Sequence, residues 1–193
     1  MRKFDSYLPF VPTQKEAELF ISSLPDLKPK AMVSLMYSSG LRVGEVCSLR
    51  YCDIQRKNMR IHVTHSKNRS DRYAILSQKA LDILTEYWFA YNRPTGWLFP
   101  KQTDPSRPID TFYIMRHMRA HEDSLGWEHR ITCHSFRHAF GTHLYENGAD
   151  LLTIKTLMGH KSLNSTLLYI HLASYQARNV MSPFDRIGGG SLE

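Results

Sequence analysis

The residues of this chain with the clearest chemical potential are spread from its first third to its last third, and most of them are basic. Transfer of a phosphodiester to a side chain needs a nucleophile, positive charge on the non-bridging oxygens and a proton for the leaving alkoxide. A tyrosine, two arginines, two histidines and a lysine together provide all three functions. The candidates are Arg42, Lys67, His134, Arg137, His160 and Tyr169. Cleavage and rejoining of DNA strands is therefore the leading hypothesis.

The local sequence indicates that several of these side chains project from the backbone where they could reach a phosphate. Arginine suits phosphate oxygens because its planar fork donates two parallel hydrogen bonds and keeps its charge. His134 and Arg137 are three residues apart, so on a helix they share a face. Arg42 follows a Gly-Leu pair in a predicted turn, and His160 follows Gly159 at a predicted helix end. At both positions we expect the side chain to project from the turn rather than to pack in the core.

Each candidate also has an ordinary structural explanation when it is taken alone. Tyr169 is one of ten tyrosines, and a buried tyrosine is far more often part of a core than a nucleophile. Arg42 could pair with Glu45 in a surface ion pair that contributes little. His134 could be a structural histidine, and Lys67 could be a solvated turn residue. Only the combination favours catalysis.

The elements that must position these residues are mainly helical, with one small antiparallel hairpin, which predicts an α+β fold that is mostly α. A capping box begins the first expected helix, and glycines end several others. Two segments that alternate with period two, 59–63 and 72–76, predict a hairpin over about 59–76 with Lys67 at its tip. Prolines between 94 and 108 predict a loop. The expected helices cover 13–23, 27–39, 43–49, 80–88, 110–121, 134–147, 150–158, 164–171 and 175–181.

Composition is that of a globular protein with a polyanionic partner. The chain has 193 residues and a formal net charge of +7, which favours nucleic acid. Three cysteines without a CxxC pair indicate a reducing compartment, and no apolar run approaches the roughly 20 residues of a membrane span, so we expect a cytoplasmic protein. We expect one domain over 1–187, followed by a segment, 188–193, with the composition of a flexible linker.

Taken together, the motifs resemble the catalytic domain of the tyrosine recombinases, or phage-type integrases. The resemblance covers about residues 12–174, and the intervals fit, since His160 comes 23 positions after Arg137 and Tyr169 comes nine positions after His160. The matching motifs are Gly40-Leu41-Arg42-Val43-Gly44-Glu45, His134-Ser135-Phe136-Arg137-His138, Gly148-Ala149-Asp150, Gly159-His160 and Tyr169-Ile170-His171. Tyr175 is a near competitor of Tyr169, but the nine-residue interval favours Tyr169.

The resemblance implies a role for each candidate. Tyr169 would attack the scissile phosphate and form a 3′-phosphotyrosyl intermediate with a free 5′-hydroxyl. Two arginines and His160 would hold the phosphate oxygens. Lys67 would protonate the 5′-oxygen, since an unperturbed lysine is protonated at neutral pH, and His134 would assist on the nucleophile side. The arginines concerned are Arg42 and Arg137.

The same resemblance implies double-stranded DNA as the partner and no cofactor, because the phosphotyrosine would store the energy needed for religation. Contacts would be made mainly with phosphates, which position the protein without specifying a sequence. The candidates for DNA contact concentrate around the hairpin and on later helices. They are Arg50, Arg56, Lys57, Arg60, Arg69, Arg72, Arg116, Arg119 and Lys155.

Members of this family usually carry a helical DNA-binding domain ahead of the catalytic one. About forty residues precede Arg42, too few for such a domain, so we expect this N-terminal domain to be absent from the chain. Weak, salt-dependent DNA binding follows from that expectation. The resemblance also implies a homotetramer on DNA, in which residues 175–187 either dock on a neighbour or pack as a helix on their own domain. The isolated domain could be monomeric in solution.

Three alternatives remain open at the level of sequence. The first is a DNA-binding module of the same fold without catalysis, and the second is a type IB topoisomerase, which shares the tyrosine chemistry. The third is a metalloenzyme that uses His134, His138 and His143, of which the first two have the spacing of a helical zinc pair. The third lacks the intervening glutamate of the H-E-x-x-H motif.

Overall fold

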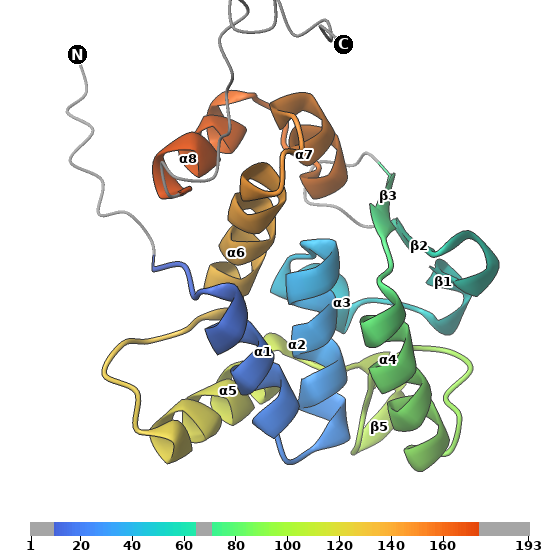
Figure 1. The fold of residues 1–193 in the computed structure, drawn as a ribbon. Coiled ribbons are helices and arrows are strands. Elements are labelled where there is room, and N and C mark those ends of the chain that lie inside the picture. The colour runs from blue at the N-terminus through green and yellow to red at the C-terminus, as the bar shows by residue number, and fades with distance from the viewer. Residues whose placement is uncertain (1–9, 65–70, 174–193) are drawn as a thin grey trace, which may run out of the picture.

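A computed structural model describes residues 10–64 and 71–173 of the chain (Figure 1). Within these ranges the fold is mainly helical, with a small antiparallel sheet at one side, so the predicted fold class is confirmed. No helix in the described ranges is long and apolar enough to cross a membrane. The α-helices are α1 (Gln14–Ser23), α2 (Leu27–Ser39), α3 (Val43–Cys47), α4 (Gln78–Ala90), α5 (Thr111–Leu125), α6 (Cys133–Glu146), α7 (Leu151–Met158) and α8 (Asn164–Leu172).

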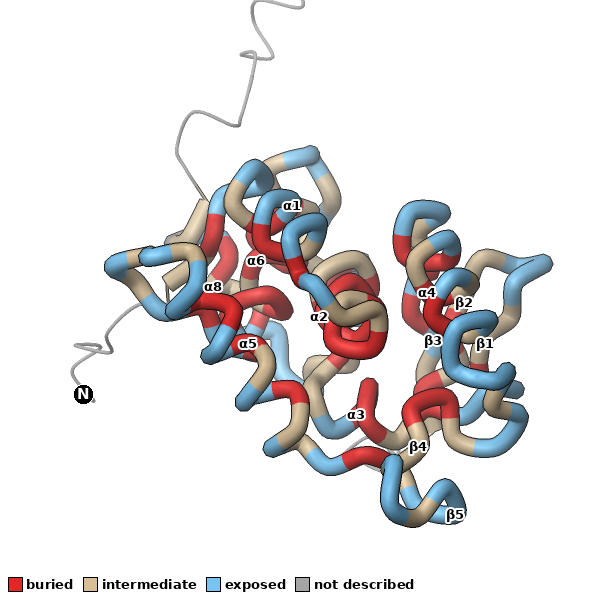
Figure 2. Tube along the Cα trace, turned by 90° about the horizontal axis from the view of Figure 1, so that it is seen from below, coloured by how far each residue is buried: buried red, intermediate tan, exposed pale blue. Residues whose placement is uncertain are grey.

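Helix α2 forms the centre of the main core, and it packs against both α4 and α6. Its buried residues lie all round the helix rather than on one stripe, which is typical of a helix surrounded by others (Figure 2). Gly40 ends it in the left-handed conformation, with φ 63°. A Cβ at Gly40 would lie 2.3 Å from the ring of Phe140 on α6, so glycine also permits the close approach of these two helices.

Helix starts follow the capping residues that the sequence predicts. Thr13 forms a reciprocal capping box with Glu16. Asp110 accepts from the Tyr113 backbone N–H, and Asp150 accepts from the second and third residues of α7. These side chains satisfy backbone donors that have no partner within the helix. The predicted positions of the main helices are therefore confirmed to within a few residues.

The sheet contains the predicted hairpin and one strand that the sequence did not predict. Its order is β1 (Ile54–Gln55), β2 (Arg60–Val63) and β3 (Arg72–Ile75), all antiparallel. Ile61 pairs with Ala74, and both are buried, so one face of the hairpin joins the core. Strand β1 has two residues between the 3₁₀ turns Tyr51–Asp53 and Arg56–Asn58, too few to show a period.

The predicted loop over 94–108 is partly wrong, since it contains β4 (Pro100–Lys101) and β5 (Asp104–Pro108). Prolines argue against strands because they cannot donate a ladder hydrogen bond, but an isolated ribbon has free edges that tolerate them. Smaller differences are that α3 ends at Cys47 rather than 49 and α5 continues to Leu125, where Gly126 ends it. The predicted helix over 175–181 and the segment 188–193 lie outside the described residues.

A second, smaller core lies between α6, α7 and α8. Its buried members are Phe140, Tyr145, Ile154, Met158 and Tyr169. This arrangement brings the end of α7 and the middle of α8 against α6 (Figure 1). The predicted nucleophile thus belongs to a packed cluster.

Candidate active site

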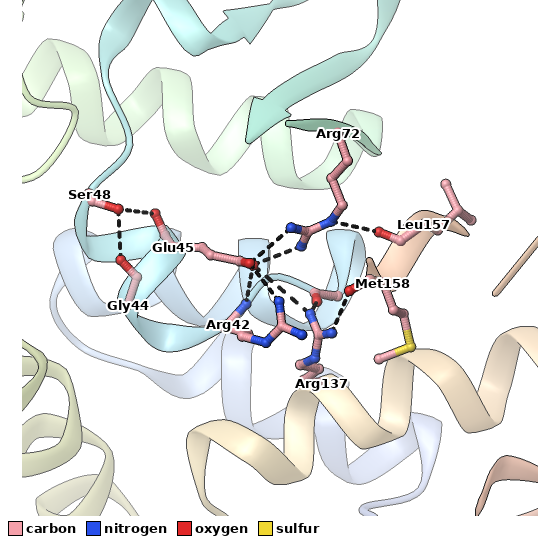
Figure 3. Close-up of polar contacts among 9 residues, drawn as sticks. Arg42, Gly44, Glu45, Ser48, Arg72, Arg137, Leu157 and Met158 are labelled. Atoms are coloured by element: carbon pink, nitrogen blue, oxygen red, sulfur yellow. Dashed lines mark hydrogen bonds and ion pairs between the residues drawn. The ribbon is translucent and has the colours of Figure 1, made fainter. Parts of the chain in front are cut away.

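Arg137 on α6 is the buried centre of the site. Its Nη1 donates to the Gly40 carbonyl at the end of α2. Its Nη2 donates to the Met158 carbonyl at the end of α7, at 2.6 Å (Figure 3). Burial and the positive charge of Arg42 lower the pKa of Arg137 to about 10. The guanidinium therefore remains charged at neutral pH and joins two distant helix ends.

Arg42 lies at the start of α3 and is held by Glu45. Its backbone N–H donates to Glu45 Oε2 at 2.9 Å, and its Nη1 donates to Oε1 at 2.8 Å. The contact considered above as a surface ion pair therefore exists. However, the Glu45 side chain is only 4% exposed, whereas that of Arg42 is 28% exposed. The pair thus has a buried anion and a cation that keeps access to solvent.

Arg72 on β3 completes the arrangement around Glu45. Its two terminal nitrogens donate to the two oxygens of Glu45 at 2.9 and 2.8 Å, and its Nε donates to the Leu157 carbonyl at 3.2 Å (Figure 3). Burial alone would raise the pKa of Glu45, but Arg72 and the hydrogen bonds from Arg42 lower it to about 2. Glu45 is therefore an anion at neutral pH, and Arg137 Nη1 lies 4.0 Å from its Oε2.

His160 follows the left-handed Gly159, which has φ 62° and ends α7. Its Nδ1 lies 2.9 Å from the Thr166 hydroxyl on α8. Burial lowers the pKa of His160 to about 4, and the charges of Arg137 and Arg42 act in the same direction. The imidazole is therefore neutral at pH 7, so its Nε2 can donate one hydrogen bond when the proton resides there.

Tyr169 on α8 lies beside both His160 and His138. The ring centroids are 6.1 Å away in each case, and the His160 ring is nearly parallel to the tyrosine, at 16°. Tyr169 is 1% exposed. Burial raises the pKa of its phenol to about 12, although Arg137 and Arg42 favour the anion. In this conformation the nucleophile candidate is neutral and covered.

The three histidines of α6 have different surroundings. His134 is exposed in the first turn and lines a groove of about 360 Å³ together with Arg119 and Arg130. His138 is half-buried, and its Nδ1 has no hydrogen-bond partner among the described residues. His143 Nδ1 lies 3.0 Å from the Tyr37 hydroxyl. Within the described ranges, no three His, Cys, Asp or Glu side chains form a metal-binding group.

The structure therefore brings four of the six predicted residues together: Arg42, Arg137, His160 and Tyr169. His134 lies at the exposed edge of the same helix as Arg137. Lys67 lies outside the described residues, as do Arg69 and the competitor Tyr175.

The predicted DNA-contact residues that the structure describes differ in their exposure to solvent. Arg72 differs from the rest because its side chain is 9% exposed and its guanidinium is bound to Glu45. Most of the others are exposed, while Arg60 and Lys155 are half-buried. The exposed set comprises Arg50, Arg56, Lys57, Arg116 and Arg119.

Sequence reasoning did not assign Glu45 or Arg72 to the centre of the site. A signal for Arg72 was present, since in a strand that alternates with period two it shares a face with the buried Ala74. A charged residue on the inward face of a strand needs a buried partner. Only the tertiary structure shows that this partner is Glu45, 27 residues earlier in the chain.

Comparison with known proteins agrees with this geometry. Residues 12–176 match the family described as "Phage integrase family". Over 178 residues, the chain is 36% identical to "Putative integrase/recombinase y4eF" of Sinorhizobium fredii, covering 92% of the chain and 70% of that protein. It is 33% identical to tyrosine recombinase XerD of Lacticaseibacillus casei, covering 77% of the chain and 52% of the relative. The chain thus spans about half the length of several curated relatives.

Solved structures show the same fold. The crystal structure of XerA recombinase superimposes with a TM-score of 0.79 and 28% identity, covering 89% of this chain and 62% of that one. The catalytic domain of bacteriophage HP1 integrase gives a TM-score of 0.62 at 18% identity, covering 86% of this chain and 89% of that one, which is a likeness of fold. With this fold and this set of motifs, the chain belongs to the phage integrase family, the family of the tyrosine recombinases.

Proposed function

We propose that this chain is the catalytic part of a site-specific DNA recombinase that breaks and rejoins strands through Tyr169. The observation that carries the proposal is the position of Arg137. Its buried guanidinium connects the turn before Arg42 to the turn before His160. Its positive charge also favours the anionic form of Tyr169. Residues distant in sequence thus form one cationic site beside a tyrosine.

The cationic site has the charge that phosphoryl transfer needs. Three arginines and one glutamate give a net charge of +2 at the centre, since 3 − 1 = 2. A phosphodiester carries one negative charge, and more charge develops on its non-bridging oxygens in the transition state. Arg42 is the most accessible of the three guanidiniums, so it would meet the phosphate first.

The reaction would proceed in two balanced steps. The Tyr169 phenol gives its proton to a base, for which His134 is proposed, and its oxygen attacks phosphorus. The bond from phosphorus to the 5′-oxygen breaks, and the 5′-oxygen takes up a proton. A 5′-hydroxyl then attacks the phosphotyrosine, a phosphodiester re-forms, and the tyrosine regains its proton. The bond count is unchanged, so no external energy source is needed. Lys67 is proposed as the acid for the 5′-oxygen.

Tyr169 must lose its proton and become accessible before it can attack. Its pKa near 12 means that the free phenol is protonated at neutral pH. The positive charges of Arg137 and Arg42 favour loss of this proton, and His134, exposed in the first turn of α6, is proposed to assist the transfer. Because Tyr169 is 1% exposed, α8 or the side chain must move when DNA binds.

Double-stranded DNA is the proposed partner. XerH recombinase, with a TM-score of 0.74 and 22% identity, has been solved bound to its difH substrate. The exposed arginines and lysines around the hairpin and on α5 would contact phosphates. Assembly of four copies on two duplexes, with residues 175–187 docking on a neighbour, is proposed for the DNA-bound state.

Covalent trapping tests the proposal directly. We would incubate the chain with a pool of nicked duplexes of randomised sequence, in which cleavage releases a short fragment and prevents religation. We expect a protein–DNA adduct that survives denaturation, with the nucleotide on the peptide that contains Tyr169. Tyr169→Phe should abolish the adduct, whereas Tyr51→Phe, at an exposed tyrosine, should not.

Other outcomes would change the assignment. An adduct that persists in Tyr169→Phe would mean that another tyrosine, such as Tyr175, is the nucleophile. DNA binding without any adduct, even after fusion to a relative's N-terminal domain, would favour the non-catalytic module. Relaxation of supercoiled plasmid without a defined site, and without exchange of partners, would favour a topoisomerase.

A further inference from the structure

Arg72 lies on strand β3 of the sheet, whereas Arg42, Arg137 and His160 lie on helices or at their ends. Each nitrogen of its guanidinium has a protein acceptor: Nη1 and Nη2 bind Glu45, and Nε binds the Leu157 carbonyl (Figure 3). The Arg72 side chain is only 9% exposed, so it offers little surface to a DNA phosphate. We therefore expect Arg72 to contribute to catalysis mainly through the groups that it holds.

The first group is the end of α7. Arg72 donates to the Leu157 carbonyl, and Arg137 donates to the next carbonyl, that of Met158. The last carbonyls of a helix lack partners within the helix and carry the negative end of its dipole. Two guanidiniums from different elements thus fix the turn that leads into His160.

Gly159 makes this approach possible. A Cβ at this position would lie 2.7 Å from Arg72 Cδ and 2.9 Å from Nε. The residue also has φ 62°, which glycine adopts without strain. The Arg72 side chain therefore crosses directly over the turn before His160.

The second group is Glu45. Its carboxylate accepts hydrogen bonds from Arg72 on one side and from Arg42 on the other. A buried carboxylate needs such compensation, since an unpaired buried charge is strongly unfavourable. Without Arg72, Glu45 would draw Arg42 inward or bind a proton, and either change would alter how Arg42 is presented.

We propose that Arg72 is a positioning residue, which fixes Glu45 and the end of α7 and thereby the groups that bind the scissile phosphate. This inference rests on the proposed function for its effect on cleavage. Arg72 also ties strand β3 of the hairpin to the arginine site, so the hairpin and the catalytic helices act as one unit.

The test compares Arg72→Lys and Arg72→Gln with Arg107→Gln, which removes an exposed arginine from strand β5. The substrate is the duplex captured by the unmodified chain, and the readouts are the single-turnover rate of adduct formation and the affinity for the same duplex. Both Arg72 variants should cleave about 100-fold more slowly, since small displacements of catalytic groups have effects of this order. Their DNA affinity should equal that of Arg107→Gln.

Two further variants separate positioning from general stability. Arg72→Ala with added guanidinium ion should recover part of the cleavage rate, because the ion can occupy the vacated space and bind Glu45. If Arg72→Gln does not fold, the double variant Arg72→Gln/Glu45→Gln removes the unpaired carboxylate, and replacing both partners is better tolerated than replacing one. A folded single or double variant that cleaves at the normal rate would overturn the proposal.

A spectroscopic measurement tests the positioning role of Arg72 without depending on DNA cleavage. In protein with ¹⁵N-labelled histidines, the imidazole signals of His160 should shift in Arg72→Lys and not in Arg107→Lys. If the unmodified chain forms no adduct, the proposed function fails, and this measurement still decides whether Arg72 positions His160. Unchanged His160 signals in folded Arg72→Lys would contradict the inference even if cleavage is observed.

Discussion

The ring of Tyr169 packs directly on the backbone of Gly141, so closely that a Cβ at Gly141 would lie 2.5 Å from Tyr169 Cζ. Gly141 lies in the middle of α6, one turn after Arg137. The helix that carries the central arginine therefore also provides the surface against which the nucleophile candidate rests. Glycine inside a helix is unfavourable relative to alanine, so its presence here has a packing reason.

Gly141→Ala should displace Tyr169, because backbone and ring cannot both keep their places. We expect a lower thermal midpoint and a large loss of adduct formation, measured on the trapped duplex. Gly96→Ala is the matched control, since a Cβ there meets nothing within 4 Å. Normal cleavage by Gly141→Ala would show that the packed position of Tyr169 is unrelated to the reactive one.

Arg137→Lys should abolish cleavage and also destabilise the fold. A lysine keeps the charge but has a single nitrogen, which cannot reach both the Gly40 and the Met158 carbonyls in the same geometry. A buried carbonyl left without its donor costs about 1–3 kcal/mol of unfolding free energy. Urea unfolding and adduct formation measure the two effects, with Arg107→Lys as control. Stability equal to that of the control would contradict the bridging role of Arg137.

The free energy of unfolding should fall as the pH is lowered from about 6.5 to about 4. Over this interval His138 and His160, both half-buried, resist protonation in the folded state. Burial lowers the pKa of His138 and of His160 to about 4 each, with nearby positive groups contributing. Since the unfolded chain then binds more protons than the folded one, acid favours unfolding. The stabilising contribution is complete above the unfolded pKa and decreases toward the folded pKa.

The urea midpoint measured between pH 7.5 and 4.5 checks this expectation. His160→Gln and His138→Gln should each reduce the pH dependence in that interval. An unchanged slope in both variants would mean that other groups, such as the buried His121 and His143, account for the acid sensitivity.

Binding of the chain to DNA should be weak and strongly salt-dependent, because phosphate contacts by surface cations would provide most of its affinity. Replacing one contacting arginine, for example Arg116→Ala or Arg56→Ala, should reduce the slope of log affinity against log salt by about one. Fluorescence anisotropy with a uniform duplex at several salt concentrations measures this. Nanomolar, sequence-selective binding at physiological salt would contradict the expectation.

The local features of the fold were accessible from the sequence, because they depend on residues close together in the chain. The Thr13 capping box, the left-handed glycines Gly40 and Gly159, and the period-two alternation of the hairpin each follow from short-range geometry. The spacing of the motif residues indicated the family. Short strands such as β1 and the proline-containing β5 were missed, since their pairing depends on the surrounding structure.

Only the tertiary structure decided how the charges of the site are arranged. The sequence placed Arg72 among the residues expected to face DNA, whereas the fold buries it against Glu45 and the end of α7. It likewise decided that Tyr169 is covered in the described conformation, by α6 and His160. A single sequence shows which residue types are present and how far apart they are along the chain. Which buried charge finds which partner is determined by long-range packing, since an unpaired charge in the interior is too unfavourable to remain.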